Sequence, residues 1–401
     1  MAMSRRALLG ATMAGLPRWS SAQQKAPIRI GVLGDMNGPY ADFGGPGSVA
    51  AARLAAEEFG SVLGRPVEIV AADHQNKPAI AASIAQGWID TNDVVAVVEC
   101  ATSGAALALQ QVLRDKRRIF LITVAGSSDL TNRACSPVGF HFNCDTYALA
   151  RGPARALTMQ GDNTWFFITV DYAFGHALER DAARFVAEAG GKVLGTIRHP
   201  LGTSDFSSYL VAARASGAKV IAFANAGQDA QNAIKQAAEF GIGRRGERLT
   251  ALLLFITDVR AVGLELAQGL VLSNSFYWDL NDATRAWTKR FQQAFKPVPP
   301  TMNQAAGYAS VRHCLRAIQQ TGSTEAQAVA AAMRNLPVND MYNDNVAIRA
   351  DGRVLSKMYL MQVKAPGKSA YRDDDYEVVL ATPGAEVFRP VAESECSLVR
   401  T

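Results

Sequence analysis

Short apolar runs alternate with amphipathic segments along almost the whole chain. Val94–Val98 and Val220–Ala224 are continuously apolar, and Ile28–Leu33 is a largely apolar strand run, whereas Pro46–Phe59 and Gln228–Phe240 have the pattern of amphipathic helices. Continuously apolar strands between amphipathic helices are typical of a parallel sheet that helices cover on both faces. Because crossovers between parallel strands are right-handed, the pattern predicts a doubly wound α/β fold.

The alternation of strands and helices occurs in two similar halves. The first half ends with a strand at Ile119–Val124, and the second runs from a strand at Trp165–Val170 to one at Leu249–Ile256. We therefore predict two mostly parallel-sheet lobes with a hinge and an interlobe cleft. Later helices are expected at 282–296, 303–321 and 324–335, and later strands at Met358–Val363 and Tyr376–Leu380. The predicted boundaries are 28–145 for lobe 1, 146–271 for lobe 2, 272–350 for a return to lobe 1, 351–365 for a lobe 2 strand and 366–401 for a C-terminal extension.

The composition of the 401 residues narrows the class of protein. Hydrophobic residues make up 49% and charged residues 19%, which is typical of a globular chain and excludes a disordered, collagen-like or coiled-coil one. No stretch of 18 or more apolar residues is present, so no bilayer-spanning helix is expected. The formal charge of +5 is not clustered into basic runs, so a nucleic-acid partner is not expected.

Residues 1–22 have the composition of an export signal. Arg5 and Arg6 precede a weakly apolar segment, Pro17 ends that segment, and small residues lead up to Ala22. This pattern predicts a cleaved signal that is too short to span a membrane, with cleavage after Ala22. Residues 4–9 resemble the twin-arginine signal, and an ordinary secretory signal is the alternative. Either route places the mature chain in the periplasm.

Five cysteines occur without a CxxC motif or the spacing of a zinc site, so no metal is expected. Cys100 and Cys314 lie in apolar, periodic segments and are expected to be buried thiols. Cys135, Cys144 and Cys396 lie in loop-like, polar surroundings, and an oxidising periplasm permits a disulfide between two of them. We favour Cys135–Cys396 over Cys135–Cys144, and the absence of any bridge is the third possibility.

Candidate ligand-binding residues follow the predicted strands, because ligands of open α/β sheets bind outside the carboxyl ends of the strands. Thr102 and Ser103 precede a predicted helix, whose N-terminus favours an anion. The alternative for one of these hydroxyls is simple helix capping, and the alternative for Ala125–Ser127 is an ordinary turn. The candidate residues are Thr102, Ser103, Ala125, Gly126, Ser127, Tyr147, Tyr172, Phe174, Asn225 and Asp258.

Four motifs occur in order: residues 30–40 with Phe43-Gly44, then 63–67, 171–175 and 237–241. Together they resemble leucine/isoleucine/valine-binding-type periplasmic proteins, over roughly residues 28–365. The resemblance implies a type I periplasmic binding fold that closes on a small ligand and delivers it to an ATP-driven importer. It therefore implies two partners, a small carboxylate and an inner-membrane permease, with no cofactor and no enzymatic activity.

The resemblance also implies roles for particular residues. The positions of Thr102 and Ser103 match a hydroxyl that binds the ligand's carboxylate in the family. The backbone of Ala125 and the hydroxyl of Ser127 match positions that contact the ligand's amino-acid head group. Tyr172 and Phe174 match the ligand-facing loop of the second lobe.

The chain departs from the family pattern at the ammonium end of the site. Phe174 and Ala226 stand where the family has tyrosines, and the region of the family's glutamate contains Thr257 and Asp258. An oxo acid or an aromatic acid is therefore a candidate ligand beside a branched-chain or other amino acid. A ligand-sensing module that signals to a membrane receptor is the alternative function. An exported oxidoreductase, suggested by the twin-arginine-like signal, is a third.

Overall fold

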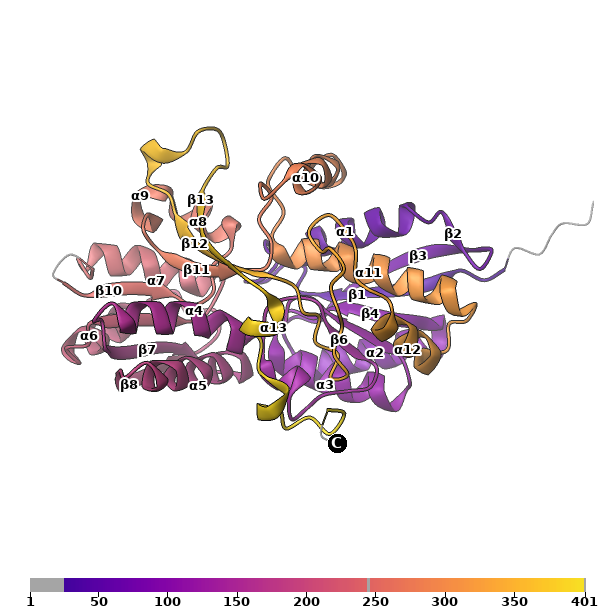
Figure 1. Cartoon of the computed structure of the whole chain (residues 1–401), viewed down its shortest axis with the longest axis horizontal. Helices are drawn as coiled ribbons and strands as arrows, with labels where there is room; N and C mark the ends of the chain where they lie inside the picture. The colour runs from indigo at the N-terminus through magenta and orange to yellow at the C-terminus, as the bar shows by residue number, and fades with distance from the viewer. Residues whose placement is uncertain (1–24, 244–245, 400–401) are drawn as a thin grey trace, which may run out of the picture.

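The computed structural model describes residues 25–243 and 246–399. The predicted export signal, residues 1–22, lies outside the described residues. Two lobes lie side by side, with β1 to β6 in one and β7 to β10 in the other (Figure 1). Among the described residues, no helix is both long and apolar enough to cross a bilayer.

Lobe 1 is built on a six-stranded sheet in the order β2-β3-β1-β4-β5-β6. Its neighbouring strands are parallel except for the β2–β3 pair. All six residues of β4 are buried, as expected for a central strand that is covered on both faces. The strands are β1 (Ile28–Gly34), β2 (Ser61–Val62), β3 (Arg65–Asp73), β4 (Val94–Glu99), β5 (Ile119–Ile122) and β6 (Gly139–His141), and the first helices are α1 (Gly45–Glu57), α2 (Pro78–Asn92) and α3 (Ser103–Asp115).

Lobe 2 contains a parallel four-stranded sheet in the order β10-β9-β7-β8. Its strands are β7 (Thr164–Val170), β8 (Lys192–His199), β9 (Val220–Ala224) and β10 (Arg248–Ala251). Its helices are α4 (Thr146–Met159), α5 (Ala173–Glu188), α6 (Ser207–Ala215), α7 (Gln228–Glu239), α8 (Ile256–Val262) and α9 (Leu264–Ala267).

A third, antiparallel sheet lies beside lobe 2 and contains β11 (Val271–Asn274), β12 (Met358–Val363) and β13 (Tyr376–Thr382). The predicted C-terminal extension thus contributes a strand, β13, to this sheet. The remaining elements of the extension are short: η2 (Pro366–Lys368), α13 (Gly384–Val387) and η3 (Val391–Glu393).

Three chain segments connect the lobes (Figure 1). The first leads from β6 of lobe 1 to α4, and the second leads from β11 back to lobe 1, where α11 packs on α1. The third leads from α12 to β12. The returning helices are α10 (Asp282–Ala294), α11 (Met302–Thr321) and α12 (Ala326–Asn335).

The predicted strand at 249–256 is wrong in its second half, because β10 ends at Ala251 and α8 begins at Ile256. Leu252–Phe255 are buried in the core, so this loop is apolar without being a strand. A short strand that was not predicted, β6, has only three residues and flanks Phe140 with a glycine and a histidine. Its apolar signal is therefore too short to recognise.

Candidate ligand-binding cleft

The two lobes touch across the cleft in a closed arrangement. The hydroxyls of Tyr40 in lobe 1 and Tyr172 in lobe 2 are 2.8 Å apart and share a hydrogen bond. The rings of Phe43 and Phe255 are stacked with their centroids 4.2 Å apart. The loops that follow β1, β7 and β10 therefore contact one another across the cleft.

The carboxyl end of β4 turns sharply before α3. Glu99 and Cys100 have φ values of 89° and 67°, in the left-handed region that non-glycine residues adopt rarely. The turn brings Thr102 to the N-cap position of α3. Ser103 Oγ accepts a hydrogen bond of 3.0 Å from the backbone N–H of Ser127, which ties this loop to the loop after β5.

The Thr102 hydroxyl is buried, and among the described residues no group forms a hydrogen bond with it. It therefore does not cap α3. Buried hydroxyls usually have a partner, so an unpaired one in a cleft is suited to a ligand. The helix that starts here has 13 residues, and its first backbone N–H groups favour an anion.

Several polar groups of the loop after β5 already have hydrogen-bond partners within the protein. The N–H of Ala125 donates to Cys100 O at 3.0 Å, and the carbonyl of Gly126 accepts from the N–H of Thr146 at 2.7 Å. Ser127 Oγ accepts from Asp129 N at 3.3 Å, as the cap of the short helix η1 (Ser128–Thr131). The Ser127 oxygen is therefore used as an acceptor to cap η1, whereas the hydroxyl hydrogen can still be donated to a ligand.

In lobe 2, the two predicted aromatic residues lie at the start of α5. Tyr172 is the N-cap residue, and Phe174 is buried. The Phe174 ring lies so close to Gly126 of lobe 1 that a Cβ atom there would be 3.0 Å from it. Both aromatic residues therefore face lobe 1.

Asn225 directly follows β9, Asp258 lies in α8 after β10, and both are buried. The side-chain amide of Asn225 is 3.1 Å from His199 Nε2, and among the described residues its Oδ1 has no hydrogen-bond partner. Asp258 Oδ1 accepts from Gln231 Nε2 at 2.7 Å, and Oδ2 accepts from the N–H of Phe255 at 3.0 Å. Burial raises the pKa of Asp258 to about 6, against the effect of these hydrogen bonds. Because Phe255 is the N-cap residue of α8, its bond to Asp258 holds the start of this helix in place.

Tyr147 does not join the other predicted residues. Its hydroxyl lies 3.4 Å from Glu393 Oε2, its ring packs edge-on against Phe185, and the guanidinium of Arg389 lies 4.6 Å from its centroid. The structure thus places Tyr147 against the C-terminal tail. The structure joins Cys135 to Cys396 by a disulfide, with Cα atoms 5.7 Å apart, and leaves the other three cysteines buried and free.

Sequence reasoning did not single out three residues around the cleft. Phe43 belongs to the first motif but has no predicted role there, and Phe255 lies in the run that is predicted as a strand. Glu99 is fully buried, and its Oε1 accepts from the N–H of Gly45 at 2.6 Å. An acidic residue at the end of a continuously apolar strand was the available signal for Glu99.

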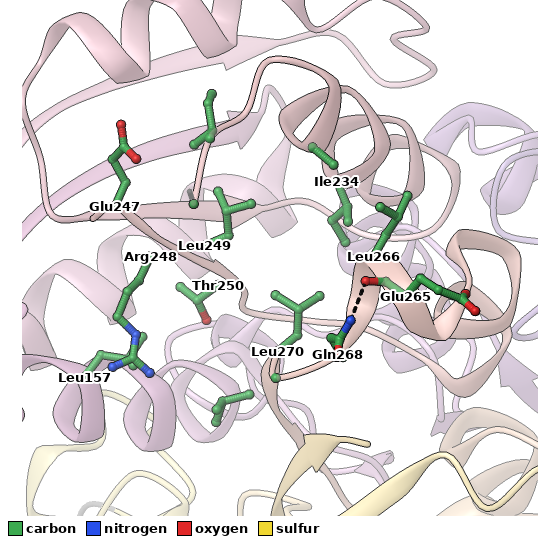
Figure 2. Close-up of a pocket in the computed structure, with 15 residues that line it drawn as sticks. Leu157, Ile234, Glu247, Arg248, Leu249, Thr250, Glu265, Leu266, Gln268 and Leu270 are labelled. Carbon is green, nitrogen blue, oxygen red and sulfur yellow. Dashed lines mark hydrogen bonds between the residues drawn. The ribbon is translucent and has the colours of Figure 1, made fainter. Parts of the chain in front are cut away.

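Two cavities differ in their relation to the lobes. A cavity of about 330 Å³ opens at the mouth of the cleft, between Met36 and Asp42 of lobe 1 and Thr257 and Arg260 of lobe 2. Figure 2 shows a second one, of about 310 Å³, which lies between helices and strands of the lobe 2 side and contains none of the predicted cleft residues. Only the first cavity lies between the lobes. No group of three or more potential metal ligands gathers in residues 25–243 and 246–399.

Comparison with known proteins agrees with this geometry. Residues 27–369 match the family model described as periplasmic binding protein. The Leu/Ile/Val-binding protein homolog 6 of Brucella melitensis is 25% identical over 319 residues, which cover 78% of this chain and 80% of that protein.

Two solved structures are more similar. A periplasmic binding protein from Burkholderia mallei is 45% identical, with a TM-score of 0.90 over 93% of this chain and 99% of that one. A periplasmic ligand-binding protein of a branched-chain amino acid ABC transporter from Burkholderia xenovorans is 36% identical, with a TM-score of 0.83 over 93% and 100%. The predicted type I periplasmic binding fold is confirmed, and the chain belongs to the periplasmic binding proteins of ABC transporters, of the Leu/Ile/Val-binding type.

Proposed function

We propose that the chain binds a small carboxylate without an ammonium group in its periplasmic cleft and delivers it to the permease of an ABC importer. The observation that carries the carboxylate is the buried Thr102 hydroxyl, which no described group satisfies. It lies at the N-terminus of α3, where backbone N–H groups and the helix dipole favour negative charge. Closure over the ligand is favoured because only the closed form offers contacts from both lobes.

The opposite wall of the cleft supports a ligand without an ammonium group. Asp258 is the acidic residue in the region where the family has a glutamate, and each of its oxygens already accepts a hydrogen bond. Phe174 stands where the family has a tyrosine and brings no hydroxyl. The aromatic residues Tyr40, Phe43, Tyr172 and Phe255 meet between the lobes and would pack on an apolar or aromatic body.

Calorimetry of the purified mature chain against three ligand classes tests this proposal. The classes are aromatic acids such as benzoate, 2-oxo acids, and branched-chain amino acids. Thr102→Val removes the hydroxyl with little change in shape and should cost about 1.5–3 kcal/mol, or about 10- to 150-fold in affinity. Thr288→Val is the matched control, because the Thr288 hydroxyl in α10 is also buried and unpaired among the described residues.

Asp258→Asn separates the ligand classes. Affinity for an amine-free acid should stay the same or rise, because a nearby negative charge is lost. A strong loss of affinity for an amino acid would show that Asp258 holds an ammonium group and would contradict a ligand without one. Unchanged affinity in Thr102→Val would contradict the proposed carboxylate position.

A further inference from the structure

The segment that follows α13 crosses from the lobe 2 side to lobe 1 (Figure 1). We call residues 388–396 the tail strap. Its first residue, Phe388, is buried, and the guanidinium of Arg353 in the third connection lies 4.4 Å from the Phe388 ring centroid. Its last residue, Cys396, is bonded to Cys135 of lobe 1. The strap is thus a fourth covalent connection between the lobes, beside the three chain segments.

Two ionic contacts hold the strap on α5 of lobe 2. Arg389 Nη2 donates to Asp181 Oδ1 at 3.3 Å, and its guanidinium lies over the ring of Tyr147. Glu393 Oε2 is paired with Arg184 Nη2 at 2.8 Å. Asp181 is almost completely buried, whereas the Glu393–Arg184 pair is about one-third exposed.

Lobe 1 holds the other end of the strap. Besides the disulfide, the N–H of Glu395 donates to Asn132 Oδ1 at 2.6 Å, and Asn132 Nδ2 donates to Glu395 Oε1 at 3.3 Å. Asn132 directly follows η1, in the loop after β5. The strap therefore reaches the same lobe 1 loop that contains Ser127.

The strap lies beside direct hydrogen bonds and ion pairs between the two lobes. Asp181 Oδ2 accepts from Ser128 Oγ of lobe 1 at 2.8 Å, and Arg180 Nη2 lies 3.3 Å from Asp129 Oδ1. Asp181 thus carries an interlobe bond on one oxygen and the strap's Arg389 on the other. Separation of the lobes at this point must break the interlobe bonds and pull on the strap.

Only a short piece of chain separates the strap's last contact with lobe 2 from its anchor on lobe 1, and this length limits how far the lobes can separate. Glu393 on lobe 2 and Cys396 on lobe 1 are three residues apart, which span about 10 Å when fully extended. If the Glu393 contact is lost, the next lobe 2 contact is Arg389, and the free length grows to seven residues, or about 24 Å. We propose that the disulfide-anchored strap restrains opening of the lobes and shifts the equilibrium toward the closed form.

Single-molecule energy transfer on the full mature chain, without ligand, measures this equilibrium. Dyes are attached through ketone amino acids at Ser83 in α2 and Glu239 in α7, two exposed positions that the strap does not contact. Glu393→Gln should raise the open-to-closed ratio about two- to fivefold, because the pair is partly exposed. Loss of the anchor in Cys135→Ser/Cys396→Ser should raise it further.

Arg248→Gln is the matched control, because it breaks a partly exposed ion pair with Asp162 that lies within lobe 2. This variant should leave the ratio unchanged. Circular dichroism must show that each variant is folded. The proposal is overturned if neither strap variant shifts the ratio, if Arg248→Gln shifts it equally, or if the unaltered chain is open throughout. Because no ligand is used, these outcomes are independent of the ligand class.

Discussion

Replacing Glu99 by glutamine should change how the stability of the protein depends on pH. Glu99 ends β4, is fully buried, and accepts one hydrogen bond from the backbone N–H of Gly45 through Oε1. Among the described residues, its Oε2 has no hydrogen-bond partner. Burial in this setting raises the pKa of Glu99 from 4.5 to about 8, although the hydrogen bond from Gly45 opposes the change.

The sign and size of the effect follow from proton binding. Between pH 4.5 and about 8, the folded chain holds a proton on Glu99 that the unfolded chain releases, so the free energy of unfolding falls as pH rises. At 1.36 kcal/mol per pH unit, the full interval corresponds to about 5 kcal/mol. This contribution is fully present below pH 4.5 and is lost as pH rises through about 8. Glutamine does not titrate, so Glu99→Gln should lack this slope.

Urea unfolding of Glu99→Gln and of the unaltered chain at pH values from about 4.5 to 9 measures the difference in their free energies of unfolding. The contributions of the other titrating groups largely cancel in this difference. Glu99→Gln should gain stability relative to the unaltered chain as pH rises. Glu58→Gln is a control of opposite sign, because burial raises the pKa of Glu58 but hydrogen bonds from Tyr308 and Arg290 lower it more. Parallel stability curves for Glu99→Gln and the unaltered chain would refute the reasoning.

Three further predictions concern processing, cross-linking and packing. The intact mass of the exported chain should correspond to cleavage after Ala22, and a retained N-terminal segment would contradict the export signal. Peptide mapping without reductant should recover Cys135 linked to Cys396, and two free thiols there would exclude the bridge. Gly175→Ala should lower the melting temperature, because the new Cβ would overlap the last carbonyl oxygen of β7. Gly87→Ala, in open space within α2, should instead stabilise by about 0.4–1 kcal/mol, and equal effects of both would contradict this packing.

The elements that periodicity predicts best are those whose burial is regular. Val220–Ala224 and Met358–Val363 have the bounds that the apolar pattern indicates. The apolar run from residue 249 to 256 is only partly a strand. Leu252–Phe255 are buried by neighbouring elements but do not belong to β10, which ends at Ala251. The apolar pattern alone does not separate a buried loop from a buried strand.

The candidate site shows the same limit at the level of side chains. The order of strands places Thr102 and Tyr172 at facing edges of the two sheets, so sequence reasoning brings both to the cleft. Whether a polar group is free depends on neighbours that are distant along the chain, such as Gln231 beside Asp258. Tyr147 is drawn to the tail by Glu393 and Arg389, more than 240 residues away, and no local pattern reveals such a contact.

The bond between Cys135 and Cys396 makes a covalent ring of the chain between them. The two cysteines are 261 positions apart, and the ring encloses all of lobe 2 together with the helices that return to lobe 1. A single protease cut anywhere inside the ring leaves one covalent molecule until a reductant is added, whereas a cut before Cys135 releases a fragment once the chain unfolds. The ring also compacts the denatured state, so the oxidised chain should expose less surface on unfolding and have a smaller denaturant slope than the reduced chain.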